Sequence, residues 1–322
     1  MPHEMDKHCF VGIDTSNYTT SLAIVSDGGE VLANLKAPLP VKAGECGLRQ
    51  SDAVFAHVKN IPQLMRAARD MLADYRVAAV GVSARPRDIE GSYMPCFLTG
   101  VAAAESFAAA AGVPLYTFSH QGGHLAAALY SANAQHLLEK EEFGAFHVSG
   151  GTTDMLCVKP LAAEFSVMQV GGSADLHAGQ AVDRIGVALG LSFPCGPSLE
   201  ALAREHTARV PRPRISVRDG VCNLSGLENL ALKLYHETGD KPLCAAYTLA
   251  FLADTLATMA EHLRAEKGSI PIVFAGGVMS NRIIAKALSE RLQDIYFAEP
   301  QFSADNAAGV ALLCRRRFYQ SN

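Results

Sequence analysis

The sequence of 322 residues is long enough for two domains, and with 49% apolar and 19% charged residues it has the composition of an ordinary globular protein. The formal net charge of −4 argues against a protein that coats nucleic acid, although it is compatible with a local basic patch. No apolar run reaches the roughly 18 residues that a membrane-spanning helix needs, and the polar start shows no signal peptide, so we expect a cytoplasmic protein without membrane contact. The eight cysteines form no CxxC pair, which predicts free buried thiols.

The first third of the chain predicts three short strands followed by alternating helices and strands. The expected strands are Cys9–Ile13, Ser21–Val25 and Val31–Leu35, with Asp27-Gly28-Gly29 as a hairpin turn. A helix with apolar residues at helical spacing follows over Gln50–Tyr75, and Pro62 is expected to kink or split it. The next elements are strand Val77–Ser83, helix Thr99–Ala111, strand Val113–Phe118 and a short helix from His120.

The same pattern restarts at Gly144. Apolar segments at Gly144–Ser149, Met155–Val158 and Phe165–Val170 again predict three successive strands. The elements expected after them are helices at Gly179–Leu189, Leu199–Glu205, Leu227–Glu237 and Pro242–Glu266, strand Ile270–Phe274, helix Val278–Gln293, strand Ile295–Ala298 and helix Asn306–Phe318. A repeated unit of this kind predicts two similar α/β lobes. We place the first in residues 1–118 with 299–322, and the second in residues 119–298.

Three loops rich in small residues could hold phosphate oxygens. Gly12–Thr20 and Val148–Asp154 occupy the same place in the two repeats, and both offer backbone N–H groups and hydroxyls. A buried strand ends in Gly276-Gly277, where a helix opens, which suits an anion or a nucleoside. Taken singly, each loop is also compatible with an ordinary turn.

A metal site is predicted by two histidines one helical turn apart. His120 and His124 lie at positions i and i+4, on one face of the helix that begins there. A third ligand is available in Asp305, which could instead cap the last helix.

These motifs resemble the TsaD/Gcp family, which makes N6-threonylcarbamoyladenosine in tRNA. The segment Asp175–Pro197 is similar to the family's D-x-A-A-G-E-A-F-D-K…L-G-L-x-Y-P-G-G-P, and Gly276–Arg282 to its G-G-V-x-x-N-R. Leu224–Leu227 is similar to its F-S-G-L, and the motifs come in the family's order from about Phe10 to Phe318. The resemblance implies a duplicated, two-lobe nucleotide-binding fold of the actin and sugar kinase type.

The resemblance also implies site residues. His120, His124 and Asp305 match the family's ligands for one divalent ion, for which we expect iron or zinc. The residues implied for binding an adenine nucleotide, as ATP, AMP or a carbamoyl-adenylate, are Val148, Ser149, Gly150, Gly151, Asp183, Gly196 and Asn281. No catalytic residue is assigned, because no Ser-His-Asp or Cys-His nucleophile arrangement stands out and no general base is assignable.

Several positions depart from the family pattern and indicate a divergent paralog. Where the family's first loop reads E-T-S-C-D-E-T, this chain has Asp14-Thr15-Ser16-Asn17-Tyr18-Thr19-Thr20. Gln180 replaces a Glu, Glu228 replaces a Lys, and Ala84–Asp88 replaces a Gly-Pro-Gly loop.

The expected activity is metal-dependent transfer of a threonylcarbamoyl group from threonylcarbamoyl-AMP to N6 of adenosine 37 in tRNA. Two alternatives are a carbamoyltransferase with another acceptor and a non-catalytic nucleotide-binding scaffold; the complete ligand set argues against the scaffold. The candidate tRNA-binding cations are Arg85, Arg87, Arg209–Arg218 and Arg315–Arg317. Because they are few, we expect the isolated chain to bind tRNA weakly and to depend on partner subunits of a threonylcarbamoylation complex.

Overall fold

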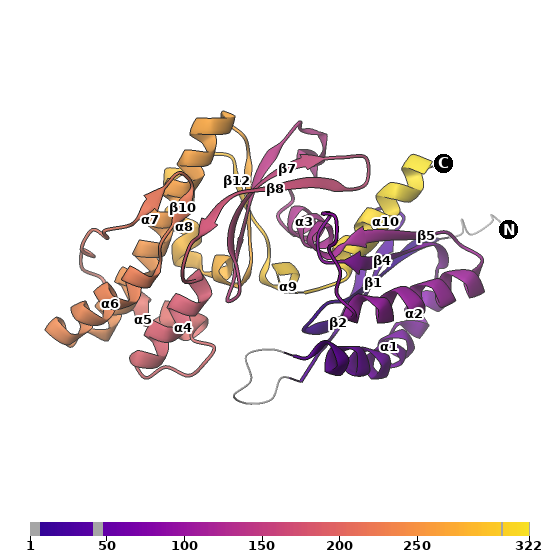
Figure 1. Cartoon of the computed structure of the whole chain (residues 1–322), viewed down its shortest axis with the longest axis horizontal. Coiled ribbons are helices and arrows are strands. Elements are labelled where there is room, and N and C mark those ends of the chain that lie inside the picture. The colour runs from indigo at the N-terminus through magenta and orange to yellow at the C-terminus, as the bar shows by residue number, and fades with distance from the viewer. Residues whose placement is uncertain (1–6, 41–47, 304, 322) are drawn as a thin grey trace. The chain divides into compact units, whose positions relative to one another are not determined.

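The structure, a computed structural model, describes residues 7–40, 48–303 and 305–321 and divides into two compact units (Figure 1). Unit 1 comprises Met1–Tyr130, Pro160–Ser166 and Ala304–Asn322, and unit 2 comprises Ser131–Lys159 and Val167–Ser303. This division differs from the predicted boundaries, 1–118 with 299–322 and 119–298, chiefly at α3 (His120–Ser131). Nearly all of α3 belongs to unit 1, because it packs so closely on α10 (Ala308–Ser321) that a Cβ on Gly309 would lie 1.8 Å from the carbonyl oxygen of Gly123.

Unit 1 is built on a five-stranded sheet in the order β3-β2-β1-β4-β5. The strands are β1 (His8–Thr15), β2 (Thr19–Ser26), β3 (Val31–Pro38), β4 (Arg76–Arg85) and β5 (Leu115–Ser119). The first three are antiparallel, whereas β1, β4 and β5 run parallel, so their carboxyl ends meet at one edge of the sheet. That edge is where α3 begins, directly after β5.

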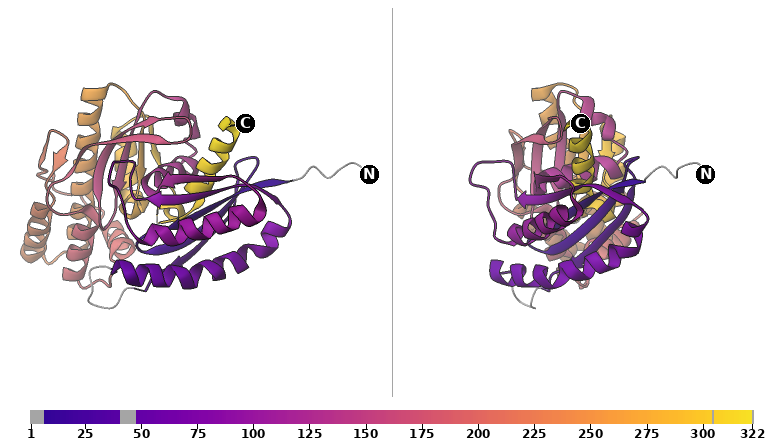
Figure 2. Two further views of the ribbon diagram at one scale, coloured as in Figure 1. Left: turned by 45° about the vertical axis from the view of Figure 1, so that its right-hand side comes forward. Right: turned by 90° about the vertical axis from the view of Figure 1, so that its right-hand side faces the viewer.

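Helices cover both faces of this sheet (Figure 2). Val11 and Ile13 of β1 pack with the buried residues of α1 (Gln50–Ala73) and α2 (Cys96–Ala111). Gly12, whose side-chain position points to the opposite face, lies against α10: a Cβ there would be 2.6 Å from the backbone nitrogen of Ala311. Gly81 of β4 has the same role, with Cys314 as its neighbour. Two glycines on adjacent strands therefore allow α10 to sit directly on the sheet.

Unit 2 contains a seven-stranded sheet in the order β12-β11-β6-β7-β8-β10-β9. Its strands are β6 (Phe143–Val148), β7 (Thr153–Pro160), β8 (Phe165–Ser173), β9 (Val217–Arg218), β10 (Val221–Cys222), β11 (Ile272–Ala275) and β12 (Ile295–Phe297). Its helical segments are η1 (Gln135–Glu139), α4 (Ala178–Ala188), α5 (Gly196–Arg204), α6 (Ser225–Thr238), α7 (Lys241–Lys267), η2 (Gly277–Ser280), α8 (Arg282–Arg291) and α9 (Pro300–Ser303). The order β12-β11-β6-β7-β8 repeats β5-β4-β1-β2-β3 of unit 1, which confirms the predicted duplication.

The longest helix, α7, is the central core helix of unit 2. It is long and apolar enough to cross a membrane, but 72% of its most apolar window is buried inside the unit. Fourteen of its residues are buried, and the twelve apolar ones among them pack with α4, α5, α6 and α8 in one apolar cluster. The apolarity of α7 is therefore explained by this core.

Two predictions about local structure have clear outcomes. Helix α1 is one continuous helix that contains Pro62, so of the two predicted effects, a kink or a split, the split is wrong. The proline leaves the carbonyl of Val58 without its helical donor; both residues are exposed, so water can take the donor's place. The seven cysteines within the described residues are free and buried, as predicted, and Cys46 lies outside those residues.

Candidate functional site

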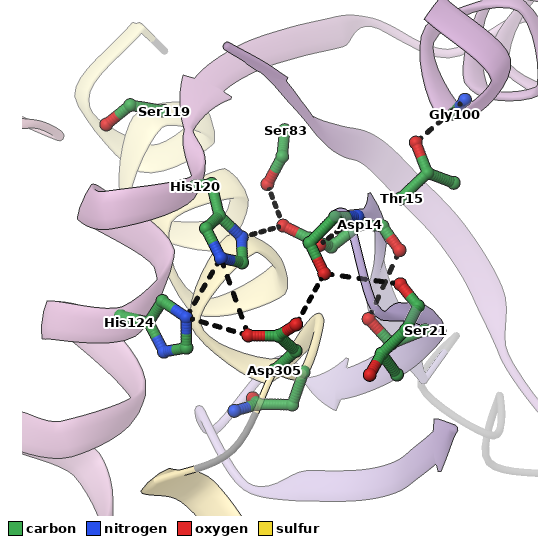
Figure 3. A network of polar contacts seen from close by, with 12 residues as sticks. Asp14, Thr15, Ser21, Ser83, Gly100, Ser119, His120, His124 and Asp305 are labelled. Carbon is green, nitrogen blue, oxygen red and sulfur yellow. Dashed lines mark hydrogen bonds and ion pairs between the residues drawn. The ribbon is translucent and has the colours of Figure 1, made fainter. Parts of the chain in front are cut away.

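The three predicted metal ligands meet in unit 1, at the edge where β1, β4 and β5 end (Figure 3). His120 is the first residue of α3, His124 lies one turn later, and Asp305 precedes α10. Their donor atoms all lie within 4.8 Å of one another. The Nε2 atoms of the two histidines are 2.9 Å apart, and Oδ1 of Asp305 lies 3.2 Å from Nε2 of His124 and 3.6 Å from Nε2 of His120.

This geometry and this donor set fit one divalent ion. Ligand atoms bonded at about 2.1 Å around a tetrahedral ion are about 3.4 Å apart, close to the three separations observed. Two imidazoles and one carboxylate form a set that both zinc and ferrous iron accept. The structure thus brings together the three residues that the sequence singled out.

The electrostatics of the cluster favour a cation. Burial lowers the pKa of His120, but the carboxylates of Asp14 and Asp305 outweigh it and raise the pKa to about 10. Burial likewise opposes ionisation of Asp305, yet hydrogen bonds with His120 and His124 hold its pKa well below the usual range. One buried and one half-buried carboxylate facing two imidazoles therefore attract positive charge.

The end of β1 and the start of the loop after it make hydrogen bonds within unit 1. Asp14 is 1% exposed, and its carboxylate accepts hydrogen bonds from Ser83, His120 and the backbone N–H of Ser16. The hydroxyl of Thr15 donates to the carbonyl of Cys96 at 3.0 Å. Sequence reasoning missed Asp14 as a site residue; its one signal was an acidic residue at the end of an otherwise apolar strand.

Residues 84–88, which replace the family's Gly-Pro-Gly loop, are hydrogen-bonded to Ser119, the residue directly before α3. The carboxylate of Asp88 accepts from Nε of Arg85 at 2.8 Å and from the hydroxyl of Ser119. Ser119 in turn caps α3 by accepting from the N–H of Gly122 at 3.0 Å. Asp88 and Ser119 therefore help to fix the end of the helix that carries His120.

A separate cavity of 420 Å³ lies within unit 2, among α4, α5, α7 and α8. Its volume is in the range of small-molecule sites. Four of the seven predicted nucleotide-binding residues line it: Gly150, Asp183, Gly196 and Asn281. Of the other three, Ser149 and Gly151 flank Gly150 in the loop, and Val148 is buried in β6 beneath it.

The residues around this cavity are held in defined positions. Oδ1 of Asp183 accepts from the N–H of Cys195 at 2.8 Å, which fixes the carboxylate at the cavity wall. The side-chain oxygen of Asn281 caps α8 by accepting from two backbone N–H groups, so the amide nitrogen is the end of the side chain left for a ligand. Gly150 and Gly196 have open space where a side chain would be, which lets a ligand approach the backbone.

Comparison with known proteins identifies a family and a fold. A family model described as "TsaD: tRNA N6-adenosine threonylcarbamoyltransferase" matches residues 42–312. Among solved structures, HypF from T. kodakarensis is similar with a TM-score of 0.61 at 14% identity, over 98% of this chain and 48% of HypF. This chain thus spans about half the length of HypF.

Two further structures are similar over nearly their full length. Component A of the (R)-2-hydroxyglutaryl-CoA dehydratase of Acidaminococcus fermentans gives a TM-score of 0.53 at 16% identity, covering 97% of this chain and 99% of that one. A ROK family glucokinase from Streptomyces griseus, in complex with glucose and AMPPNP, gives 0.51 at 13% identity, covering 96% and 99%. Likeness at this level shows the fold, and it confirms the predicted actin- and sugar-kinase-like class.

Proposed function

We propose that this chain, which belongs to the TsaD family of tRNA N6-adenosine threonylcarbamoyltransferases, is a metal-dependent enzyme. The proposed reaction is transfer of a threonylcarbamoyl group from threonylcarbamoyl-AMP to N6 of adenosine 37 in tRNA. The observation that carries the proposal is the convergence of His120, His124 and Asp305, whose donor atoms lie within 4.8 Å of one another. An iron or zinc ion held there would supply a Lewis acid that polarises the carbonyl of the group to be transferred.

In this proposal the residues of unit 2 bind the nucleotide part of the donor substrate. The carboxylate of Asp183 accepts a hydrogen bond from a ribose hydroxyl, and the amide nitrogen of Asn281 donates to the ligand. The N–H group of Gly150 contacts phosphate oxygens, because this glycine has no side chain to keep the phosphate away.

The proposal is tested by removing the imidazoles. His120→Ala combined with His124→Ala leaves a single carboxylate, which cannot fix the geometry of an ion, so we expect metal content to fall from about one ion per chain to near zero. The readouts are metal content by mass spectrometry and formation of N6-threonylcarbamoyladenosine in tRNA, with partner subunits present. The matched control is His236→Ala, since His236 is exposed on α6, outside the cluster.

Full metal content in the double variant would show that the ion is bound elsewhere. Metal loss in the double variant, with no modified nucleoside formed even by wild type and control, would reject the tRNA substrate and keep the metal centre.

A second candidate is carbamoyl transfer to another acceptor. It is favoured by Arg85 and Asp88, an ion pair at 2.5 Å in the loop where the family has Gly-Pro-Gly, because a changed loop beside α3 alters what can approach the metal ligands. The same mass spectrometry, applied to small molecules and proteins incubated with the donor, distinguishes the two acceptors.

A further inference from the structure

Behind the three metal ligands lies a second layer of polar groups that comes from other elements of unit 1. Asp14 is near the end of strand β1, and Ser83 is near the end of β4, the parallel neighbour of β1. Figure 3 shows Asp14 between Ser83 and the ring of His120, on the side of the ring that faces away from His124 and Asp305. Asp14 contacts the ring through Nδ1, whereas the cluster is formed by Nε2.

The contact with Asp14 determines which ring nitrogen of His120 carries the proton. A carboxylate oxygen only accepts hydrogen bonds, and Oδ2 of Asp14 lies 2.7 Å from Nδ1 of His120, so Nδ1 must donate. In the neutral ring Nε2 then carries the lone pair. That nitrogen is the one that points toward His124 and Asp305.

The carboxylate of Asp14 is held in this orientation by further hydrogen bonds. Its other oxygen accepts from the backbone N–H of Ser16 at 3.0 Å, and the hydroxyl of Ser83 donates to the same oxygen that faces His120. The side chain is 1% exposed, so water cannot replace these partners.

Ser16 acts on the third ligand in a similar way. Its hydroxyl lies 2.7 Å from Oδ2 of Asp305, which leaves Oδ1 to face the two histidines. Ser16 is itself held by His57, whose Nε2 lies 2.9 Å from its carbonyl oxygen while Nδ1 lies 2.8 Å from the hydroxyl of Thr20. His57 is completely buried, so this support is part of the packed interior.

We propose that Asp14 and Ser16 are positioning residues of the metal centre: Asp14 keeps the lone pair of His120 on Nε2, and Ser16 keeps Oδ1 of Asp305 turned toward both imidazoles. The inference rests on the metal centre of the proposed function. In other metalloproteins, removing such outer partners weakens metal affinity about 10- to 100-fold.

The decisive variant is Asp14→Asn. The N–H of Ser16 requires an oxygen on its side, so the new amide must turn its NH₂ group toward Nδ1 of His120. Nδ1 then accepts, the proton moves to Nε2, and the nitrogen needed by the metal is blocked. We expect the Kd for Zn²⁺, measured by competition with a chromophoric chelator, to rise about 10- to 100-fold.

A second readout reports which nitrogen of the His120 ring carries a proton and does not depend on metal affinity. Long-range ¹H–¹⁵N spectra of protein labelled with ¹⁵N-histidine distinguish Nδ1–H from Nε2–H. The expected result is that Nδ1 of His120 carries a proton in wild type, with or without a second proton on Nε2, and that in Asp14→Asn the proton lies on Nε2 alone. A role confined to stability would change the melting temperature and leave the tautomer as it is.

Two companion variants complete the test. Asp74→Asn removes the same charge from an exposed residue just before β4, at the far end of that strand from Ser83, and should leave Kd unchanged. Ser16→Ala keeps Asp14 intact and should raise the Kd for Zn²⁺ about tenfold. This variant still tests the proposal if Asp14→Asn does not fold.

Unchanged Kd in Asp14→Asn and Ser16→Ala, with His120 in its wild-type tautomer, would overturn the positioning role and leave the metal centre standing. A wild-type protein that takes up no divalent ion would overturn the metal centre itself.

Discussion

At the residue scale, the carboxylate of Asp183 at the wall of the cavity in unit 2 is held in position by its neighbours. The N–H of Cys195 is 2.8 Å from Oδ1, and Cys195 fits there because Gly186 opposite has no side chain: a Cβ on Gly186 would lie 2.3 Å from Cβ of Cys195. The carboxylate is thereby oriented before a ligand arrives, which reduces the entropic cost of binding.

We therefore expect Asp183→Ala to weaken AMP or ATP binding about 10- to 100-fold, because a hydrogen bond to a charged group contributes about 1.5–3 kcal/mol. The measurement is the rise in melting temperature with nucleotide concentration, compared with that of Glu237→Ala, which removes an exposed carboxylate at the end of α6. If both variants respond to nucleotide as wild type does, Asp183 does not contact the ligand.

At the scale of elements, the sequence predicted the parts whose signal is local. The spacing of His120 and His124 is a property of one helix, and repeated apolar segments predicted both sets of strands. The two-residue strands β9 and β10 were missed, because two residues are too few to show a period. The role of Asp14 was missed because its partner His120 is 106 residues away, and only the parallel pairing of β1, β4 and β5 brings them together.

The close approach of α10 to the sheet of unit 1 can be tested at Gly81. A Cβ there would lie 2.7 Å from Cβ of Cys314 and 3.0 Å from the carbonyl oxygen of Val310, so Gly81→Ala forces α10 outward. Overpacking of this kind costs about 1–3 kcal/mol, which urea unfolding would detect. Because Asp305 lies just before α10, we also expect weaker metal binding. Gly28→Ala is the control, since the nearest atom to its Cβ is 3.7 Å away; equal stability of the two variants would contradict this packing argument.

At the scale of the whole molecule, a formal net charge of −4 means that the proposed tRNA binding must depend on where the cations lie. Some candidates serve the fold: Arg315 donates to the carbonyl of Asp27 at 2.6 Å and lies over the ring of Tyr319. Arg209 and Arg212, in contrast, are exposed in residues 206–216 between α5 and β9, a segment without helix or strand. We therefore take this segment as the candidate phosphate-binding surface of unit 2.

We predict that Arg209→Ala combined with Arg212→Ala weakens tRNA binding to a similar degree for all tRNA sequences, because the phosphate backbone carries no sequence information. Every arginine–phosphate pair that the substitutions remove should also reduce the slope of log K against log salt concentration by about 0.7–0.9. Affinity is measured by filter binding over a series of salt concentrations. The matched control is Arg66→Ala combined with Arg69→Ala, which removes two exposed cations from α1. If both pairs change the slope equally, binding depends on overall charge and not on residues 206–216; if neither does, the phosphates of tRNA must be bound by a partner subunit.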